Sequence, residues 1–271
     1  LGAGGQGPGN PHLTSRAAAG EGGIRRGIGV SFVIEPTGAA RRRIGGGYGA
    51  CRLRMELSGR VSVFPSLSQQ GQGHETTISQ IVADRLAMPL EDVQVLEADT
   101  STTPYGIGNG SSRSSAMLMP AVYVAANLLR DKIAAIAAHR LHAAAEDLVF
   151  EDRTVRAGDH TLALRDVAMT AYNDLDLLPD HIDPGLEIIG YFTNPNIVYD
   201  HDERGRRNEF AAYPYEAVVA AVDVDEATGQ VEIVKYVSVH DCGTMLNPRI
   251  VQTQHTGSIM QGIGAALFEE L

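Results

Sequence analysis

Three polar, glycine-rich segments of this sequence carry residue types that can bind a ligand, and each precedes an expected helix. The segments are residues 70–76, 106–115 and 241–248. A helix N-terminus presents unpaired backbone N–H groups and the positive end of the helix dipole, so it favours phosphate or another anion. Glycine lets backbone amides approach such a ligand closely. Together the three segments predict a site for a large, polar, phosphate-bearing cofactor.

Side-chain amides accompany these glycines. Gln70, Gln72, Asn247 and Gln254 lie within or just after the three segments. Each amide offers a paired donor and acceptor, which suits the edge of a heterocycle. We therefore expect the ligand to carry a heterocycle as well as phosphate.

A purely structural interpretation is open for the same segments. Gln-Gly-Gln-Gly can be a turn before a helix that is capped by Thr76 or Thr77. Residues 111–115 can be a polar loop with a serine as the N-cap of the next helix. These alternatives need no ligand.

The sequence gives little support for a metal site whose ligands are side chains of this chain. His74-Glu75 begins like a zinc-protease motif, but Ile78 occupies the position of the second histidine ligand. His139 and His142 share one face of an expected helix, a pattern more typical of a solvated surface than of a metal site.

The two cysteines, Cys51 and Cys242, are too few for an iron–sulfur cluster or a cysteine-based zinc site within this chain alone. So few cysteines are typical of a reduced, cytoplasmic location. Phosphate-binding P-loop and nucleophile-elbow motifs are absent from the sequence.

Composition is that of an ordinary globular protein. The 271 residues are 44% hydrophobic and 20% charged, enough for one large domain or two modest ones. There is no apolar run of about 18 residues that could span a membrane, and no secretory signal is expected. The net charge of −11 disfavours nucleic acid as a partner.

The order of expected elements predicts an α+β fold. Residues 1–23 are expected to be a flexible lead-in, followed by a first α+β part over 24–150 and a second over 151–271. Residues 173–210 are expected to be irregular. Strands are expected at 27–34, 50–57, 60–64, 93–96, within 150–164, at 217–224 and at 231–239, and helices at 78–86, 121–145, 166–172 and 250–271. The strands at 50–57 and 60–64 are expected to form a hairpin with Ser58-Gly59 at its turn, and the last two strands are expected to be joined by a turn around Thr228-Gly229.

The sequence resembles the molybdenum-binding large subunit of the xanthine dehydrogenase, aldehyde oxidase and aerobic carbon monoxide dehydrogenase family, from about Arg26 to Leu271. The Gln-Gly-Gln-Gly-His-Glu-Thr form looks most like the bacterial three-subunit branch. The order and spacing of four stretches carry the resemblance: Gln70 to Thr76, Ser112 to Ser115, Asp241-Cys242-Gly243 with Asn247-Pro248, and Gln254 to Gly264.

This resemblance implies a molybdenum-pyranopterin cofactor, usually the cytosine dinucleotide form in bacteria. It also implies the cofactor-binding domain of the molybdenum hydroxylase type, with mixed sheets and packed helices. Residues implied to contact pterin and phosphates are Gln70, Gly71, Gln72, Gly73, His74, Thr76, Ser112, Arg113, Ser114 and Ser115. Residues implied to hold the dinucleotide portion are Cys242, Gly243, Asn247 and Gln254.

Two positions depart from the family pattern. Ser111 stands where the family usually has Gly, and Thr256 where it often has Gly, Glu or His. We expect both side chains to crowd the cofactor.

The implied activity is hydroxylation of an aldehyde, an N-heterocycle or a similar small substrate, with water as the oxygen source. Electrons would pass to iron–sulfur and FAD groups on partner subunits. The family's catalytic glutamate lies in a glycine-rich motif downstream of the last helix, and this sequence reaches Leu271 before that motif. We therefore expect no catalytic residue here, and a second polypeptide that supplies the glutamate if the chain is a natural split subunit.

Two other classes of function stay open. One is a non-catalytic binding or assembly module that keeps the fold. The other is a hydrolase that uses His74 and Glu75 with a metal ion.

Overall fold

The computed structural model describes residues 23–39 and 47–270 and divides into two compact units. Unit 1 contains residues 23–35 and 213–244, and unit 2 contains residues 36–212 and 245–270, apart from 40–46. The expected flexible lead-in, except Gly23, lies outside the described residues.

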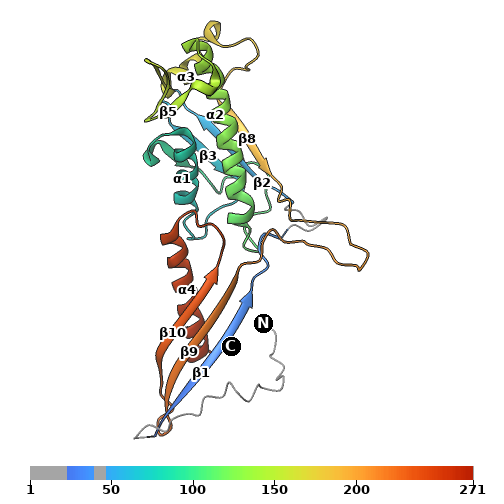
Figure 1. Ribbon diagram of the computed structural model, residues 1–271, viewed down its shortest axis with the longest axis vertical. Coiled ribbons are helices and arrows are strands. Elements are labelled where there is room, and N and C mark those ends of the chain that lie inside the picture. Colours follow the sequence, from blue (N-terminus) through green and yellow to red (C-terminus); the bar gives the residue numbers. More distant parts are fainter. Residues whose placement is uncertain (1–22, 40–46, 271) are drawn as a thin grey trace. The chain divides into compact units, whose positions relative to one another are not determined.

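Unit 1 is an antiparallel sheet of three long strands in the order β1-β9-β10 (Figure 1). These strands are β1 (Ile24–Ile34), β9 (Tyr215–Asp225) and β10 (Val231–Asp241). Val30 pairs with Val219, which pairs in turn with Val237, so one face of the sheet is rich in apolar side chains. The three strands expected here are confirmed, and each is longer than predicted.

Unit 2 is built around a four-stranded sheet in the order β4-β3-β2-β8. Its strands are β2 (Gly49–Met55), β3 (Val61–Pro65), β4 (Val93–Val95) and β8 (Glu187–Phe192). Gly59, with φ +83°, lies in the turn between β2 and β3, which confirms the predicted hairpin. The prediction that residues 173–210 are irregular is wrong at β8, which pairs with β2 along its length.

Four helices and a small third sheet complete unit 2. The helices are α1 (His74–Leu86), α2 (Met119–Leu141), α3 (Leu164–Tyr172) and α4 (Pro248–Leu267). The small sheet consists of β5 (Val149–Glu151), β6 (Thr154–Ala157) and β7 (His160–Ala163). A π-helical turn over Ser114–Leu118 leads into α2. The three sheets with packed helices confirm the α+β class.

The core of unit 2 lies between its larger sheet and helices α1 and α2. Leu53 and Val63 from the sheet, Ile78 from α1 and Leu129 from α2 are fully buried there. Figure 1 shows α2 lying along the sheet. Gly190 of β8 allows α2 to lie close to the sheet, because a Cβ there would lie 2.5 Å from the backbone N of Ala125.

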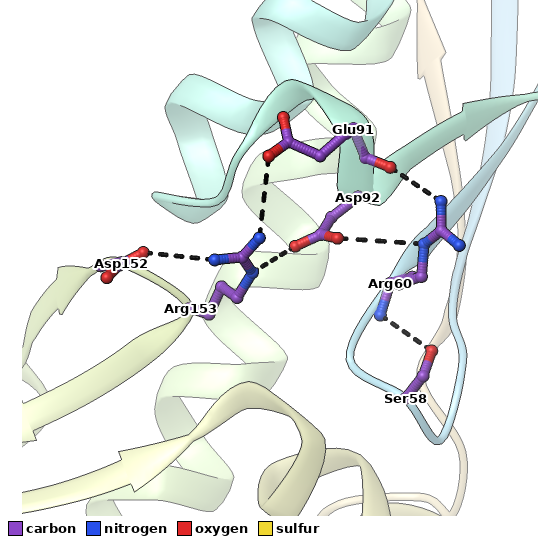
Figure 2. A network of polar contacts seen from close by, with 6 residues as sticks. All are labelled: Ser58, Arg60, Glu91, Asp92, Asp152 and Arg153. Carbon is purple, nitrogen blue, oxygen red and sulfur yellow. Dashed lines mark hydrogen bonds and ion pairs between the residues drawn. The ribbon is translucent and has the colours of Figure 1, made fainter.

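A polar network ties three surface turns of unit 2 together (Figure 2). Arg153 donates from Nε to Asp92, and Arg60 donates from Nη2 to the backbone O of Glu91 at 2.7 Å. The hydrogen bond to Asp92 raises the pKa of Arg153. The network also includes Ser58 and Asp152. Its members are mostly exposed, so we assign it a structural role in holding the turns.

The predicted boundary at residue 150 falls inside β5, and unit 2 continues on both sides of it. Among the helices of the described chain, none is long and apolar enough to cross a membrane.

Candidate functional site

The turn into α1 is formed by two glycines with left-handed backbones. Gly71 has φ +94° and Gly73 has φ +76°. Gly73 is the N-cap of α1 and provides no side-chain cap. The N–H groups of the first turn of α1 therefore receive no bond from a capping side chain, which leaves this end of the helix suited to an anion.

The alternative of a threonine cap is wrong, because α1 begins at His74, about one turn earlier than expected, and its N-cap is Gly73. Thr77 lies within the first turn, and its Oγ1 donates to the backbone O of His74 at 3.1 Å. Thr76 is exposed. Neither hydroxyl accepts a bond at the helix start.

Side-chain amides and a carboxylate shape the segment before α1. Gln72 accepts through Oε1 from the backbone N of Gln70. The backbone N of Gln69 donates to Oε2 of Glu97 at 2.8 Å, and burial raises the pKa of that carboxyl group. Gln72 is half-buried and Gln70 is exposed. The loop is therefore held in place while Gln70 faces solvent.

His74 is the buried polar group at this helix start. It is only 4% exposed, and its Nδ1 has no hydrogen-bond partner among the described residues. Burial lowers the pKa of His74, which favours the neutral imidazole with one donor and one acceptor nitrogen. A buried nitrogen without a partner is costly and indicates a missing ligand or water.

The start of α4 lies against α1 through one side chain. Asn247 is the N-cap of α4 and accepts from the backbone N of Ile250 at 3.0 Å. Its Nδ2 donates to Oε1 of Gln80 in α1 at 3.0 Å. Pro248 occupies the first turn, where its missing N–H costs nothing.

An open cavity of about 190 Å³ lies between the α1 turn and the first turns of α4. Its lining residues are Gly71, Gln72, Gly73, Arg249, Ile250, Thr253 and Gln254. We call this cavity the α1–α4 groove. The structure thus brings Gly71, Gln72 and Gly73 together with Gln254 around one cavity.

Sequence reasoning missed Arg249, Ile250 and Thr253 as lining residues. Their signal is helical spacing, since Arg249 and Thr253 lie one turn apart on one face of α4. Thr256 lines an adjoining hollow that also includes Thr253. Its hydroxyl donates to the backbone O of Gln252 at 2.9 Å.

The serine-rich segment before α2 is tied to the same region. Ser114 donates from Oγ to Oδ1 of Asn109 at 3.3 Å, and Asn109 donates from Nδ2 to the backbone O of Ser68. Ser111 and Ser112 have left-handed backbones, with φ +51° and +50°. Glycine adopts this conformation more easily than serine, which gives a physical reason for the glycine expected at Ser111.

The alternative of an N-cap serine in this segment is wrong, because the N-cap of the π-helical turn is Arg113, which forms no side-chain cap. Arg113 is buried, and its Nη2 donates to the backbone O of Tyr48 at 2.9 Å. Burial lowers the pKa of Arg113. Ser112 and Ser115 are exposed.

Two of the predicted residues belong to unit 1. Cys242 is exposed at the end of β10, and Gly243 has φ +72°. The backbone N of Gly243 donates to Oδ1 of Asp241 at 2.9 Å. This turn presents the Cys242 thiol at the surface of unit 1.

The described residues contain no group of three or more His, Cys, Asp or Glu side chains that could hold a metal ion. Cys51 is fully buried, and burial raises the pKa of its thiol well above the usual range. That thiol is therefore an inert core residue.

Comparison with known proteins identifies the class of protein. The profile of the molybdopterin cofactor-binding domain matches residues 11–271. The chain therefore belongs to the molybdopterin cofactor-binding domains of the large-subunit family of xanthine dehydrogenase, carbon monoxide dehydrogenase and aldehyde oxidoreductase.

Individual relatives agree with this assignment. The chain is 33% identical over 253 residues to the carbon monoxide dehydrogenase large chain of Hydrogenophaga pseudoflava, covering 90% of this chain and 29% of the relative. It is 33% identical over 256 residues to the nicotine 6-hydroxylase large subunit of Paenarthrobacter nicotinovorans, with the same coverage of both chains. The chain thus spans less than a third of the length of these relatives.

A solved structure shows the same fold. Quinoline 2-oxidoreductase from Pseudomonas putida 86 superposes with a TM-score of 0.76 and 31% sequence identity. The match covers 92% of this chain and 31% of that one.

The residues present fit a molybdopterin. A Cβ on Gly71 would meet no atom within 4 Å, so the backbone there is open to a ligand. The groove offers backbone amides, the Gln72 and Gln254 amides and one guanidinium. His74, the residue after Gly73, has a buried Nδ1 without a partner among the described residues. Such a set suits a polar ligand that carries phosphate.

Proposed function

We propose that this chain is the cofactor-holding part of a molybdenum hydroxylase. The enzyme would be an oxidoreductase that acts on an aldehyde, an N-heterocycle or a similar small substrate, with water as the oxygen source. Membership of the molybdopterin-binding family supports the proposal. The single observation that carries it is the α1–α4 groove, which gathers Gly71, Gln72, Gly73 and Gln254 around one cavity.

In this proposal the chain binds and orients the cofactor. The amides at Gly71 and Gly73 and the positive end of α1 attract phosphate. The amides of Gln72 and Gln254 recognise heterocycle edges, and neutral His74 accepts a hydrogen bond through its unpartnered Nδ1. When bound, the molybdenum cofactor supplies the redox chemistry, which the protein positions and protects.

The remaining predicted contacts are part of the proposal. Residues Gln70, Thr76, Ser112, Arg113, Ser114 and Ser115 contact pterin or phosphate, and Cys242, Gly243 and Asn247 hold the dinucleotide portion. The cofactor would be the cytosine dinucleotide form. Arg113 and Asn247 already form side-chain hydrogen bonds within the chain, which leave fewer of their donors and acceptors for a ligand. In the proposal these two residues therefore mainly hold the neighbouring segments in position.

The proposed hydroxylation implies partner subunits that accept electrons. Electrons from the cofactor would leave through iron–sulfur and FAD groups on other subunits. The relatives named above are a large chain and a large subunit, which supports an assembly of several chains. We assign the role of the catalytic glutamate to none of the described residues. In the proposal, a second polypeptide supplies it if the chain is a natural split subunit.

One observation favours a second candidate, a binding or assembly module without catalysis. Asn247 uses both its Oδ1 and its Nδ2 for contacts within the chain, and such contacts need no cofactor. A module of this kind would fold normally and contain no pterin.

The oxygen source provides the test of the hydroxylase proposal. The natively purified protein, with whatever co-purifies, would be offered aldehydes and N-heterocycles in ¹⁸O-labelled water with an artificial electron acceptor. The proposal expects product that carries the label from water. Turnover with oxygen derived from O₂, or pterin-loaded protein that turns over none of these classes, would contradict it.

A further inference from the structure

The two faces of the unit 1 sheet differ in chemistry, because side chains alternate between the faces along each strand. One face carries polar groups near its middle: Ser31, Glu216 and Ser238, the last two joined by a side-chain hydrogen bond. The other face presents aliphatic and aromatic side chains from all three strands. We call it the apolar face of unit 1, and its members are Ile28, Val30, Phe32, Ile34, Tyr215, Ala217, Val219, Val237 and Val239.

The apolar face of unit 1 is open to solvent along its length. Val30, in the middle of β1, is 70% exposed, and Val239 of β10 is 68% exposed. Phe32 and Tyr215 are also exposed, and their ring centroids lie 6.4 Å apart. A contiguous exposed apolar patch of several hundred Å² typically marks a contact with another protein or with a membrane.

The charged side chains on this side of the sheet lie at its rim. Arg26, Asp223 and Glu232 form one row across the end of the three strands. Lys235 lies on the outer strand β10, and Asp241 lies at the other end of that strand. The rim therefore holds both signs of charge, whereas a surface that binds anionic lipid is typically rich in lysine and arginine alone. This mixture favours a protein as the partner.

A second copy of this chain matches the face in charge as well as in polarity. With a two-fold axis parallel to the strands, two such sheets stack as in a β-sandwich, and β1 of one copy lies over β10 of the other. The rows keep their order in this arrangement, so Val30 faces Val237 of the second copy. Arg26 then faces Glu232 of the second copy, and the symmetry forms this pairing of opposite charges twice.

The size of the face is sufficient for such a dimer. Each of the three strands has 11 residues. At about 3.4 Å per residue and about 4.8 Å between strands, the face measures roughly 35 Å by 14 Å, or about 500 Å². Two copies together would cover about 1,000 Å², which is the lower size of a specific protein–protein interface.

We infer that the apolar face of unit 1 is a dimer interface at which two copies of this chain pack their sheets face to face. This dimer uses only residues of unit 1 and needs no cofactor, so it goes beyond the proposed function. The competing occupant of the face is a different polypeptide, such as one corresponding to the parts of the relatives that this chain does not span.

Sedimentation equilibrium of the full 271-residue chain over a wide range of concentrations tests the inference. Val30→Lys places a charge in the middle of the apolar face. Ser31→Lys is the matched control, because Ser31 is the next residue of β1, is exposed and lies on the opposite face. Val239→Lys tests the same face from β10, and circular dichroism shows which variants are folded.

We expect wild type to pass from monomer to dimer as its concentration rises. Val30→Lys and Val239→Lys should weaken dimerisation about a hundredfold or more, because the dimer would bury an unpaired ammonium group in each copy. Ser31→Lys should dimerise as wild type does. A monomeric wild type at every concentration would overturn the inference and leave the face to a different polypeptide. Dimerisation of the folded lysine variants at wild-type strength, or an equal loss in Ser31→Lys, would also overturn it.

Discussion

The side chain of Asn247 joins the start of α4 to the middle of α1. Its Nδ2 donates to Oε1 of Gln80 in α1, and its Oδ1 accepts from the backbone N of Ile250 in α4, both at 3.0 Å. One amide therefore caps α4 and sets the position of that helix against α1. Asn247 immediately precedes the first turns of α4, whose residues line the α1–α4 groove together with the Gly71–Gly73 turn.

Removal of this amide should weaken unit 2. Asn247→Ala loses both the cap and the bond to Gln80, so we expect a fall of about 1–3 kcal/mol in the free energy of unfolding. Asn247→Ser keeps a capping oxygen but is too short to reach Gln80, and it should lose roughly half as much. Urea unfolding measures both values. A loss in Asn247→Ala alone, with Asn247→Ser at wild-type stability, would show that the contact with Gln80 contributes nothing.

The left-handed glycines should differ in their tolerance of a side chain. Gly71→Ala and Gly73→Ala both place alanine at positive φ, at a cost of about 1–2 kcal/mol each. A Cβ at Gly73 would also lie 2.9 Å from Cδ1 of Ile250, whereas Gly71 faces open space. Gly73→Ala should therefore be the less stable variant.

A substitution at Ile250 tests whether this side chain causes the difference between Gly71→Ala and Gly73→Ala. Ile250→Val removes the Cδ1 atom that the new Cβ would meet. In an Ile250→Val background, thermal unfolding should show Gly71→Ala and Gly73→Ala costing nearly the same. A difference that persists in this background would mean that Ile250 is not its cause.

His74 should make stability depend on pH. Burial lowers the pKa of His74 in the folded state, so below about pH 6.5 the unfolded chain binds a proton that the folded chain does not. The stability that His74 contributes is present at pH 8 and is lost as the pH falls through its unfolded pKa. His74→Gln cannot titrate, so its free energy of unfolding should fall less between pH 8 and pH 5 than that of wild type. Parallel pH profiles would contradict the assignment.

Gln72 should matter for cofactor retention more than for folding. Gln72→Ala removes a half-buried amide from the groove wall, and we expect it to retain several-fold less pterin. Gln94→Ala, at an exposed position of β4, is the matched control. Pterin fluorescence after oxidation reports retention in both. Wild-type retention in Gln72→Ala would remove Gln72 from the site.

Patterns within short stretches of the sequence predicted the hairpins and their turns. The alternation over residues 50–64 with Gly59 at the turn predicted the β2–β3 hairpin, and Thr228-Gly229 predicted the turn between β9 and β10. Strand β8 was missed because its conformation depends on β2 and α2. Gly190 interrupts its apolar run and is required by the backbone of Ala125, a contact that the local sequence does not reveal.

The candidate site also contains residues that the sequence indicates and residues that only the fold positions. The family resemblance implies that Gly71, Gln72 and Gln254 contact one cofactor, and these residues line one groove. Arg249 and Thr253 were missed because their role depends on where α4 begins and which face it turns to α1. The α1 start was misplaced because its cap is a glycine backbone, which gives no side-chain signal.

The most direct test of the account is the molybdenum and pterin content of the protein purified natively, with whatever co-purifies, from a cell that makes the cofactor. Elemental mass spectrometry gives the metal, and fluorescence after oxidation gives the pterin. The account predicts near-stoichiometric amounts of both, with cytidine monophosphate released on hydrolysis. Folded protein that lacks both molybdenum and pterin would contradict it.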